Sequence, residues 1–109
     1  MKDKIFKLVG LARRAGKIAL GMSMLEKMIR RKRVALILIA EDATTNTVDK
    51  VLSLQPSCPY LVFGAKTEWG KALGRDQIAV LGVLDPNFAE GILLNYDAEE
   101  GKQNGKNVS

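Results

Sequence analysis

The stretch GMSMLEKMIRRKRVALILIAED, residues 21–42, decides the fold of this chain. A glycine opens an amphipathic helix over residues 21–31, and the basic run 30–33 ends it. The apolar side chains of this helix at i, i+3, i+4 spacing are Leu25, Met28 and Ile29. Residues 34–40 follow at once as a continuous run of mostly branched apolar residues, typical of a strand buried on both faces. The stretch therefore predicts a helix with dense positive charge at one end, joined to a buried strand.

Helices and strands alternate outward from this stretch. The expected helices are 3–15, 21–31, 47 to about 54, 66–73 and 86 to about 94. The expected strands are 17–20, 34–40, 59–63 and 78–84. The third helix has three candidate N-caps, and Asp85 with Pro86 starts the last helix. This order predicts an α/β fold, a three-layer α/β/α sandwich around a small mixed sheet of about four strands.

A chain of 109 residues suits one domain with one core. We expect residues 1–95 to form a single RNA-binding α/β domain, and nothing in the sequence marks a linker that would divide it. From Tyr96 onward the chain becomes polar and rich in Gly, Asn and Lys. We expect residues 96–109 to be a disordered tail.

The positive charge is concentrated at the start of the chain. Residues 1–33 contain 11 Lys or Arg and 2 Asp or Glu, a net +9, while residues 34–109 contain 6 and 10, a net −4. The two parts sum to the formal charge of +5. This asymmetry favours an anionic partner for the first third of the chain. The alternative is an ordinary solvated charged face.

Several classes of function lack the residues they need. The chain has no histidine, which removes Ser-His and Cys-His nucleophilic sites and His-based metal sites. The single cysteine, Cys58, excludes a disulfide scaffold and suits a reducing cytoplasm, and we interpret it as a small apolar residue at the start of a strand. Gly64 and Gly70-Lys71 have the wrong spacing for a P-loop, and Ala72 stands at the magnesium-binding position. We therefore expect no catalytic residues, metal or cofactor.

The exposed face of the helix over residues 21–31 is the candidate binding surface. Met24, Lys27 and Arg31 lie at i, i+3, i+7, opposite the apolar side chains. Gly21 lets the backbone of a partner approach the start of the helix, where free N–H groups suit phosphate or base-edge acceptors. These features favour nucleic acid, and the alternative is a solvent-exposed face with one stray methionine.

Several consecutive motifs carry a family resemblance. An N-terminal helix is followed by KIAL (17–20), GMSMLEK (21–27), the basic run, ALILIAEDA (35–43) and CPYLVFGAKTEWGKALG (58–74). Over residues 3–94 this order resembles the kink-turn-binding ribosomal protein superfamily of the L7Ae and L30e type, and most of all its bacterial YlxQ-type members. The resemblance implies a non-enzymatic RNA-binding protein that binds the kinked form of a structured RNA and stabilises it.

The resemblance also implies the residues that contact RNA. Gly21 and Lys27 match the family pattern of the helix that enters the RNA groove, while Ser23 and Met24 stand where Asn and an acid or amide are frequent. A thioether is a poor acceptor for a guanine amino group, so Met24 predicts altered base reading. The two loops that would cover a flipped-out nucleotide correspond to Thr44, Thr45 and Val48, and to Arg75, Asp76 and Gln77. The expected phosphate contacts are Lys17, Lys27, Arg30, Arg31 and Arg33.

The expected partner is a structured RNA, a kink-turn or ribosomal RNA, with no DNA specificity and no membrane, bound by a cytoplasmic monomer. Two alternatives are other binding roles: a protein-interaction module for an acidic surface, and the RNA-recognition subunit of a translation or rRNA-processing complex. A third is a small metabolic enzyme, against which the absence of histidine argues.

Overall fold

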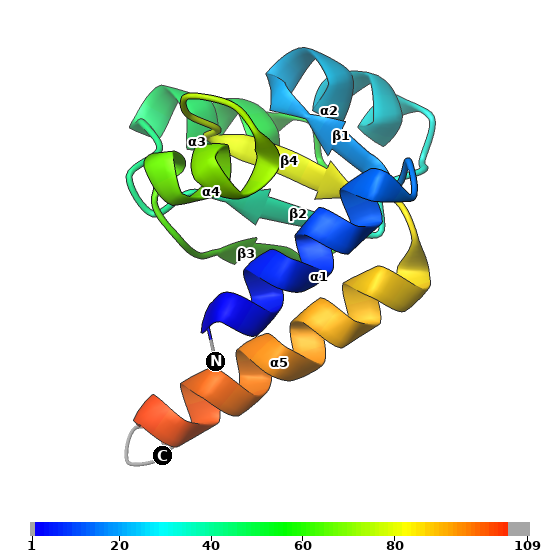
Figure 1. The fold of residues 1–109 in the computed structure, drawn as a ribbon. Helices are drawn as coiled ribbons and strands as arrows, with labels where there is room; N and C mark the ends of the chain where they lie inside the picture. Colours follow the sequence, from blue (N-terminus) through cyan, green and yellow to red (C-terminus); the bar gives the residue numbers. More distant parts are fainter. Residues whose placement is uncertain (1, 105–109) are drawn as a thin grey trace.

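A computed structural model describes residues 2–104 and contains one four-stranded sheet with helices on both faces (Figure 1). The helices are α1 (Lys2–Arg14), α2 (Gly21–Arg30), α3 (Thr45–Ser53), α4 (Lys66–Leu73) and α5 (Pro86–Asn104). The strands are β1 (Ile18–Leu20), β2 (Leu36–Ile39), β3 (Tyr60–Val62) and β4 (Val80–Val83). The predicted α/β fold and mixed four-stranded sheet are confirmed, although each strand is shorter than expected.

The buried strand β2 separates the two apolar layers. Leu36 and Leu38 belong to a core cluster on the face covered by α1, α4 and α5. Ile37 and Ile39 belong to a second cluster on the face covered by α2 and α3. Because successive side chains of a strand point to opposite faces, a continuous apolar run serves both layers at once. This is the physical origin of the three-layer sandwich.

The sheet has the order β1-β4-β2-β3, in which β4 runs antiparallel to both β1 and β2 and β3 runs parallel to β2. The strands β1, β2 and β3 therefore end on the same side of the sheet, where β4 begins. We call this side the carboxyl end of the sheet and the opposite side the amino end. The segments that follow β1 and β2, and the segment that precedes β4, meet at the carboxyl end.

Helix α2 packs closely onto β4. Its Leu25 is fully buried, and a Cβ built at Gly82 of β4 would lie 2.8 Å from the Leu25 Cδ1 atom. The absence of a side chain at this position therefore gives the leucine its space. This contact fixes α2 against the sheet and leaves its other face to solvent.

The last helix is longer than the sequence indicates. Its start is confirmed, because the Asp85 carboxylate accepts a hydrogen bond from Asn87 N at 2.7 Å and Pro86 is the first helical residue. Its predicted end near Leu94 is wrong, and residues 96–104 of the expected tail are helical. The Tyr96 ring packs against Phe63 at a centroid distance of 5.9 Å, which ties this part of α5 to the core. The rest of the expected tail, 105–109, lies outside the described residues.

Two other features bear on the excluded functions. Cys58 is partly buried against the second core cluster, and burial raises the pKa of its thiol, in agreement with a packing role. Over residues 2–104, none of the helices combines the length and the apolar character that crossing a bilayer requires.

Candidate nucleic-acid interface

The first turn of α2 is open to a ligand. Leu20 is the N-cap residue, no side chain caps the helix, and no acidic residue lies in the first turn. The backbone at Gly21 has a φ of +83°, and a Cβ built there would meet no atom within 4 Å. The left-handed conformation explains the glycine, and the space above it is free. The helix therefore presents uncapped N–H groups and its positive dipole end at the carboxyl end of the sheet.

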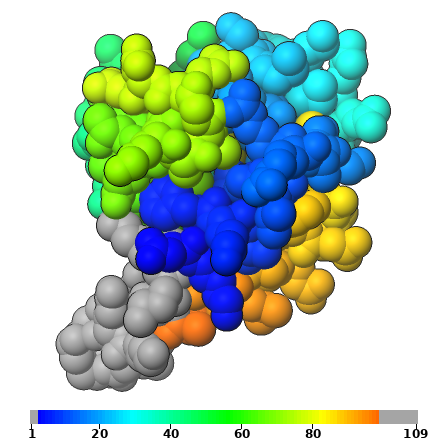
Figure 2. Space-filling view, in the orientation of Figure 1, coloured from blue at the N-terminus to red at the C-terminus, as the bar shows by residue number. Residues whose placement is uncertain are grey.

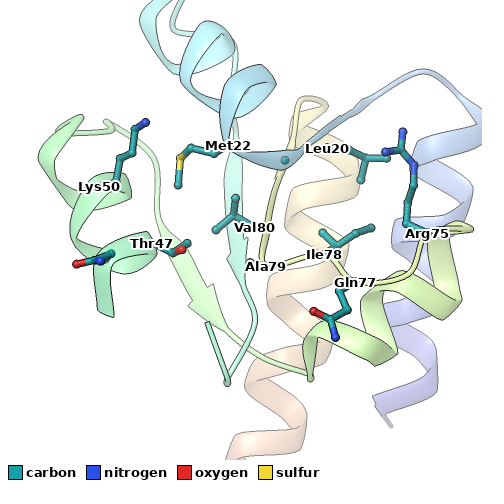
Figure 3. Close-up of a pocket in the computed structure, with 11 residues that line it drawn as sticks. Leu20, Met22, Thr47, Lys50, Arg75, Gln77, Ile78, Ala79 and Val80 are labelled. Carbon is teal, nitrogen blue, oxygen red and sulfur yellow. The ribbon is translucent and has the colours of Figure 1, made fainter. Parts of the chain in front are cut away.

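A groove of about 340 Å³ lies beside this turn (Figure 3). Its apolar lining consists of Leu20, Met22, Ile78, Ala79 and Val80. Its polar lining consists of Asn46, Thr47, Lys50, Arg75 and Gln77. In Figure 3 the labelled side chains of α3 lie on one side of Ala79 and Val80, and Arg75 and Gln77 lie on the other. An apolar surface with amide, hydroxyl and cationic groups around it suits a planar ring with polar edges, such as a nucleobase.

The exposed face of α2 continues from the groove. Ser23, Met24 and Lys27 are all exposed, and Met24 retains 43% of its accessible surface. The prediction that Met24 faces away from the core is confirmed. A partner seated over Gly21 would meet a hydroxyl, a thioether and an ammonium in succession along this face.

The cations that end α2 differ in their surroundings. Arg30 binds Glu26 one turn earlier, with 2.7 Å between Nη2 and Oε2. The hydrogen bond from Arg30 holds the pKa of the Glu26 carboxyl below its usual range. Arg31 and Arg33 are exposed, and within residues 2–104 no acidic side chain pairs with either. Arg30 therefore has an acidic partner within α2, whereas Arg31 and Arg33 have none among the described residues.

The segment after β2 lines the groove with other residues than those the sequence predicts. Thr44 is the N-cap of α3 and accepts a hydrogen bond from Thr47 N at 3.2 Å. Val48 packs against the core beneath α2 and α3, and Thr45 is exposed outside the groove. The groove is lined instead by Asn46, Thr47 and Lys50, which sequence reasoning missed. Their only signal is the i, i+4 spacing of Asn46 and Lys50, which places both on one side of a helix.

The structure divides the predicted contact residues between the two ends of the sheet. Gly21, Arg75 and Gln77 line the groove at the carboxyl end, and Asp76 is exposed between the last two. Lys17 lies at the amino end, where its carbonyl accepts a hydrogen bond from Leu84 N at 2.8 Å. Arg31 and Arg33 follow the other end of α2, and ten residues of helix span about 15 Å. The open helix start and the basic run are therefore separate surfaces.

We expect Gly21→Ala to lower the free energy of unfolding by about 1 kcal/mol, because a Cβ at positive φ is strained even where space is free. Gly21→Asn is the matched control, since asparagine adopts this conformation more readily than alanine. Urea denaturation of the three proteins measures the effect. Equal stability of Gly21→Ala and wild type would contradict a conformational reason for the glycine.

The comparisons with known proteins agree on one family. The model of the ribosomal protein L7Ae/L30e/S12e/Gadd45 family matches residues 3–92. The chain belongs to this family. The resemblance seen in the sequence is thus confirmed, and membership in a ribosomal-protein family agrees with the prediction of a non-enzymatic protein.

Two relatives are more than 30% identical to this chain. The RNA-binding protein YlxQ of Bacillus subtilis (strain 168) is 34% identical over 94 residues, covering 84% of this chain and 94% of the relative. The RNA-binding protein YlxQ of Enterococcus faecium is 31% identical over 91 residues, covering 82% and 87%.

Two solved structures resemble this chain. A Bacillus halodurans C protein of unknown function has a TM-score of 0.75 at 30% identity, covering 84% of this chain and 94% of its own. The Giardia lamblia 15.5kD RNA binding protein has a TM-score of 0.67 at 23% identity, covering 85% and 84%, and shares the fold.

Proposed function

We propose that this protein binds structured RNA of the kink-turn type and stabilises its bent form, as a cytoplasmic, monomeric component of a ribonucleoprotein in translation. The observation that carries the proposal is the groove beside the uncapped start of α2, where Gly21 leaves open space. Support comes from the names of the two YlxQ relatives, both RNA-binding proteins.

The bent RNA would present two kinds of group to this surface. A widened groove offers base edges, which lie within reach of the α2 N–H groups, Ser23 and Lys27. An extruded base offers a π-face and polar edges, which match the apolar lining and the polar side chains Asn46, Arg75 and Gln77 of the protein groove. The absence of an acid or amide at Met24 leaves the backbone N–H groups and Lys27 as the main readers of base edges.

The protein would act by shifting a population. An RNA that samples extended and kinked forms moves toward the form to which the protein binds more tightly, by as much as the difference between the two affinities. No bond is made or broken, and no cofactor is required.

A binding titration tests the proposed function. The protein is titrated with a kink-turn RNA and with a variant whose sheared G·A pairs are replaced by Watson–Crick pairs, at physiological ionic strength. We expect clear preference for the kink-turn RNA. Equal affinity for the two RNAs, or binding to an acidic protein surface in their place, would overturn the proposal.

We expect Lys27→Ala to weaken binding to kink-turn RNA by about 1–3 kcal/mol, because Lys27 lies one turn beyond Ser23 on the exposed face and reaches base acceptors. Lys71→Ala, which removes another exposed charge, from α4, is the control and should leave binding nearly unchanged. If Lys27→Ala weakened binding to kinked and straight RNA equally, Lys27 would be a phosphate contact only.

A further inference from the structure

The turn that follows α2 places a lysine where the backbone favours glycine. Lys32 N donates to Ile29 O at 2.9 Å and Arg33 N donates to Met28 O at 3.0 Å, the two hydrogen bonds of a Schellman motif. Lys32 therefore occupies the left-handed position of this motif, with a φ of +56°. Helix α1 ends with the same two bonds, but there Gly16 holds the left-handed position at +75°. The backbone thus gives no reason for a lysine at 32.

The charge of Lys32 adds to a cluster that no acidic group offsets. Arg31, Lys32 and Arg33 are consecutive and exposed, and within the described part of the chain none of them forms an ion pair. Lys17 is also exposed, and its carbonyl accepts from Leu84, which lines the same shallow hollow as Lys32 and Arg33. Asp85, the nearest acid in the sequence to Leu84, uses its carboxylate to cap α5. We call these four cations the basic turn.

Mutual repulsion and a left-handed lysine both disfavour this arrangement in the free protein. A cation near a helix C-terminus interacts favourably with the helix dipole, but the last turn of α2 already contains two such cations, Lys27 and Arg30. A bound polyanion would make the cluster favourable, because each phosphate that a lysine or arginine contacts offsets the repulsion between the cations and releases condensed counterions. In Figure 2 the cyan segment around residue 30 protrudes at the edge of the molecule, where a long ligand can reach it.

We infer that the basic turn is a second RNA-binding surface, which contacts the phosphate backbone of the duplex that continues beyond the bend. It lies about 15 Å along α2 from Gly21, so an RNA that ends beside the groove does not reach it. This inference rests on the proposed function. It adds Lys32 as a contact residue and divides the roles: the groove selects the bend, and the basic turn adds affinity that depends on stem length and salt.

The test uses two kink-turn RNAs, one whose stem ends beside the bend and one whose stem continues for a further duplex turn. We expect wild-type protein to bind the long RNA several-fold more tightly at low salt. Lys32→Gly should lose most of this advantage, lower the slope of log affinity against log salt on the long RNA by about 1, and raise Tm by a few degrees as strain is relieved.

Gln55→Gly is the matched control. Gln55 also has a left-handed backbone, with a φ of +49°, in the corresponding position after α3, but it carries no charge. We expect this variant to raise Tm in the same way and to keep the preference for the long RNA. If both variants gain stability but only Lys32→Gly loses affinity for the long RNA, the loss of affinity is due to the missing charge and not to the relief of backbone strain.

Three results would overturn the inference: equal wild-type affinity for the short and long RNAs, retention of the long-stem advantage by Lys32→Gly, or its loss in Gln55→Gly. None of them bears on the comparison of kinked with Watson–Crick-paired RNA, which tests the proposed function separately. The failure of one proposal can therefore be distinguished from the failure of the other.

Discussion

Trp69→Ala is expected to lower the free energy of unfolding by about 3–5 kcal/mol, the range for truncating a large buried aromatic side chain. Trp69 retains 1% of its accessible surface, and its ring lies 4.3 Å from that of Phe6 between centroids. Its Nε1 donates to Phe63 O at 2.6 Å, so truncation also leaves a buried carbonyl without its partner. The free energy of unfolding of a whole protein is only about 5–15 kcal/mol, so this substitution removes a large part of it.

We expect the truncation of Trp69 to affect the groove as well as the core. Next to the Trp69 hydrogen bond, Glu41 N donates to Gly64 O at 2.7 Å and Lys66 N donates to Asp42 Oδ1 at 2.8 Å. These two bonds attach the loop before α3 to the start of α4. A void at Trp69 loosens this attachment, and we expect RNA affinity to fall together with stability.

Urea denaturation followed by far-UV circular dichroism measures the change, because the variant has no tryptophan fluorescence. Leu94→Ala is the control: Leu94 is a large apolar residue of α5 that retains 63% of its accessible surface. Its truncation should change stability by no more than about 0.5 kcal/mol. Similar losses in the two variants would show that the aromatic cluster is not the main support of this face of the sheet.

The sequence allows prediction of those features that depend on neighbouring residues. The run LILI of β2 must be covered on both faces, Asp85 and Pro86 must start a helix, and the period of α2 separates Leu25 from Lys27. Each of these follows from local stereochemistry and apolar periodicity. These local features were sufficient to predict the layers of the fold and the exposed face of α2.

The features that sequence reasoning missed depend on contacts between distant residues. The continuation of α5 relies on the packing of Tyr96 against Phe63, which the polar composition after Leu94 does not reveal. The groove exists because β4 pairs with β1 and β2 in a defined register, which brings Arg75 and Gln77 opposite Asn46. The separation of Gly21 from the basic run follows from the length of α2, whereas adjacency in sequence suggests one surface.

The loop that carries Arg75 and Gln77 depends on a glycine beneath it. Gly70 lies inside α4, and a Cβ built on it would overlap the carbonyl oxygen of Asp76 and lie 2.7 Å from that of Arg75. Both atoms belong to the backbone, so no side-chain rotation can relieve the overlap. Helix α4 can approach this loop closely only because position 70 has no side chain.

We therefore expect Gly70→Ala to lower the free energy of unfolding by about 2–3 kcal/mol, as overpacking against backbone does. It should also weaken RNA binding more than its effect on stability explains, because the loop must move and the groove changes shape. The control is Gly10→Ala in the middle of α1, where a Cβ would meet no atom within 4 Å. There alanine should stabilise the helix by about 0.5–1 kcal/mol.

Chemical denaturation and RNA titration of both variants, at a temperature at which each is fully folded, separate the two effects. If folded Gly70→Ala bound kink-turn RNA as tightly as wild type, residues 75–77 would not be part of the binding surface, and the groove would have to act through α2 and α3 alone. If instead its affinity fell while Gly10→Ala kept wild-type affinity, the position of this loop would be a determinant of recognition. The close packing of α4 against the loop would then serve the binding site as well as the fold.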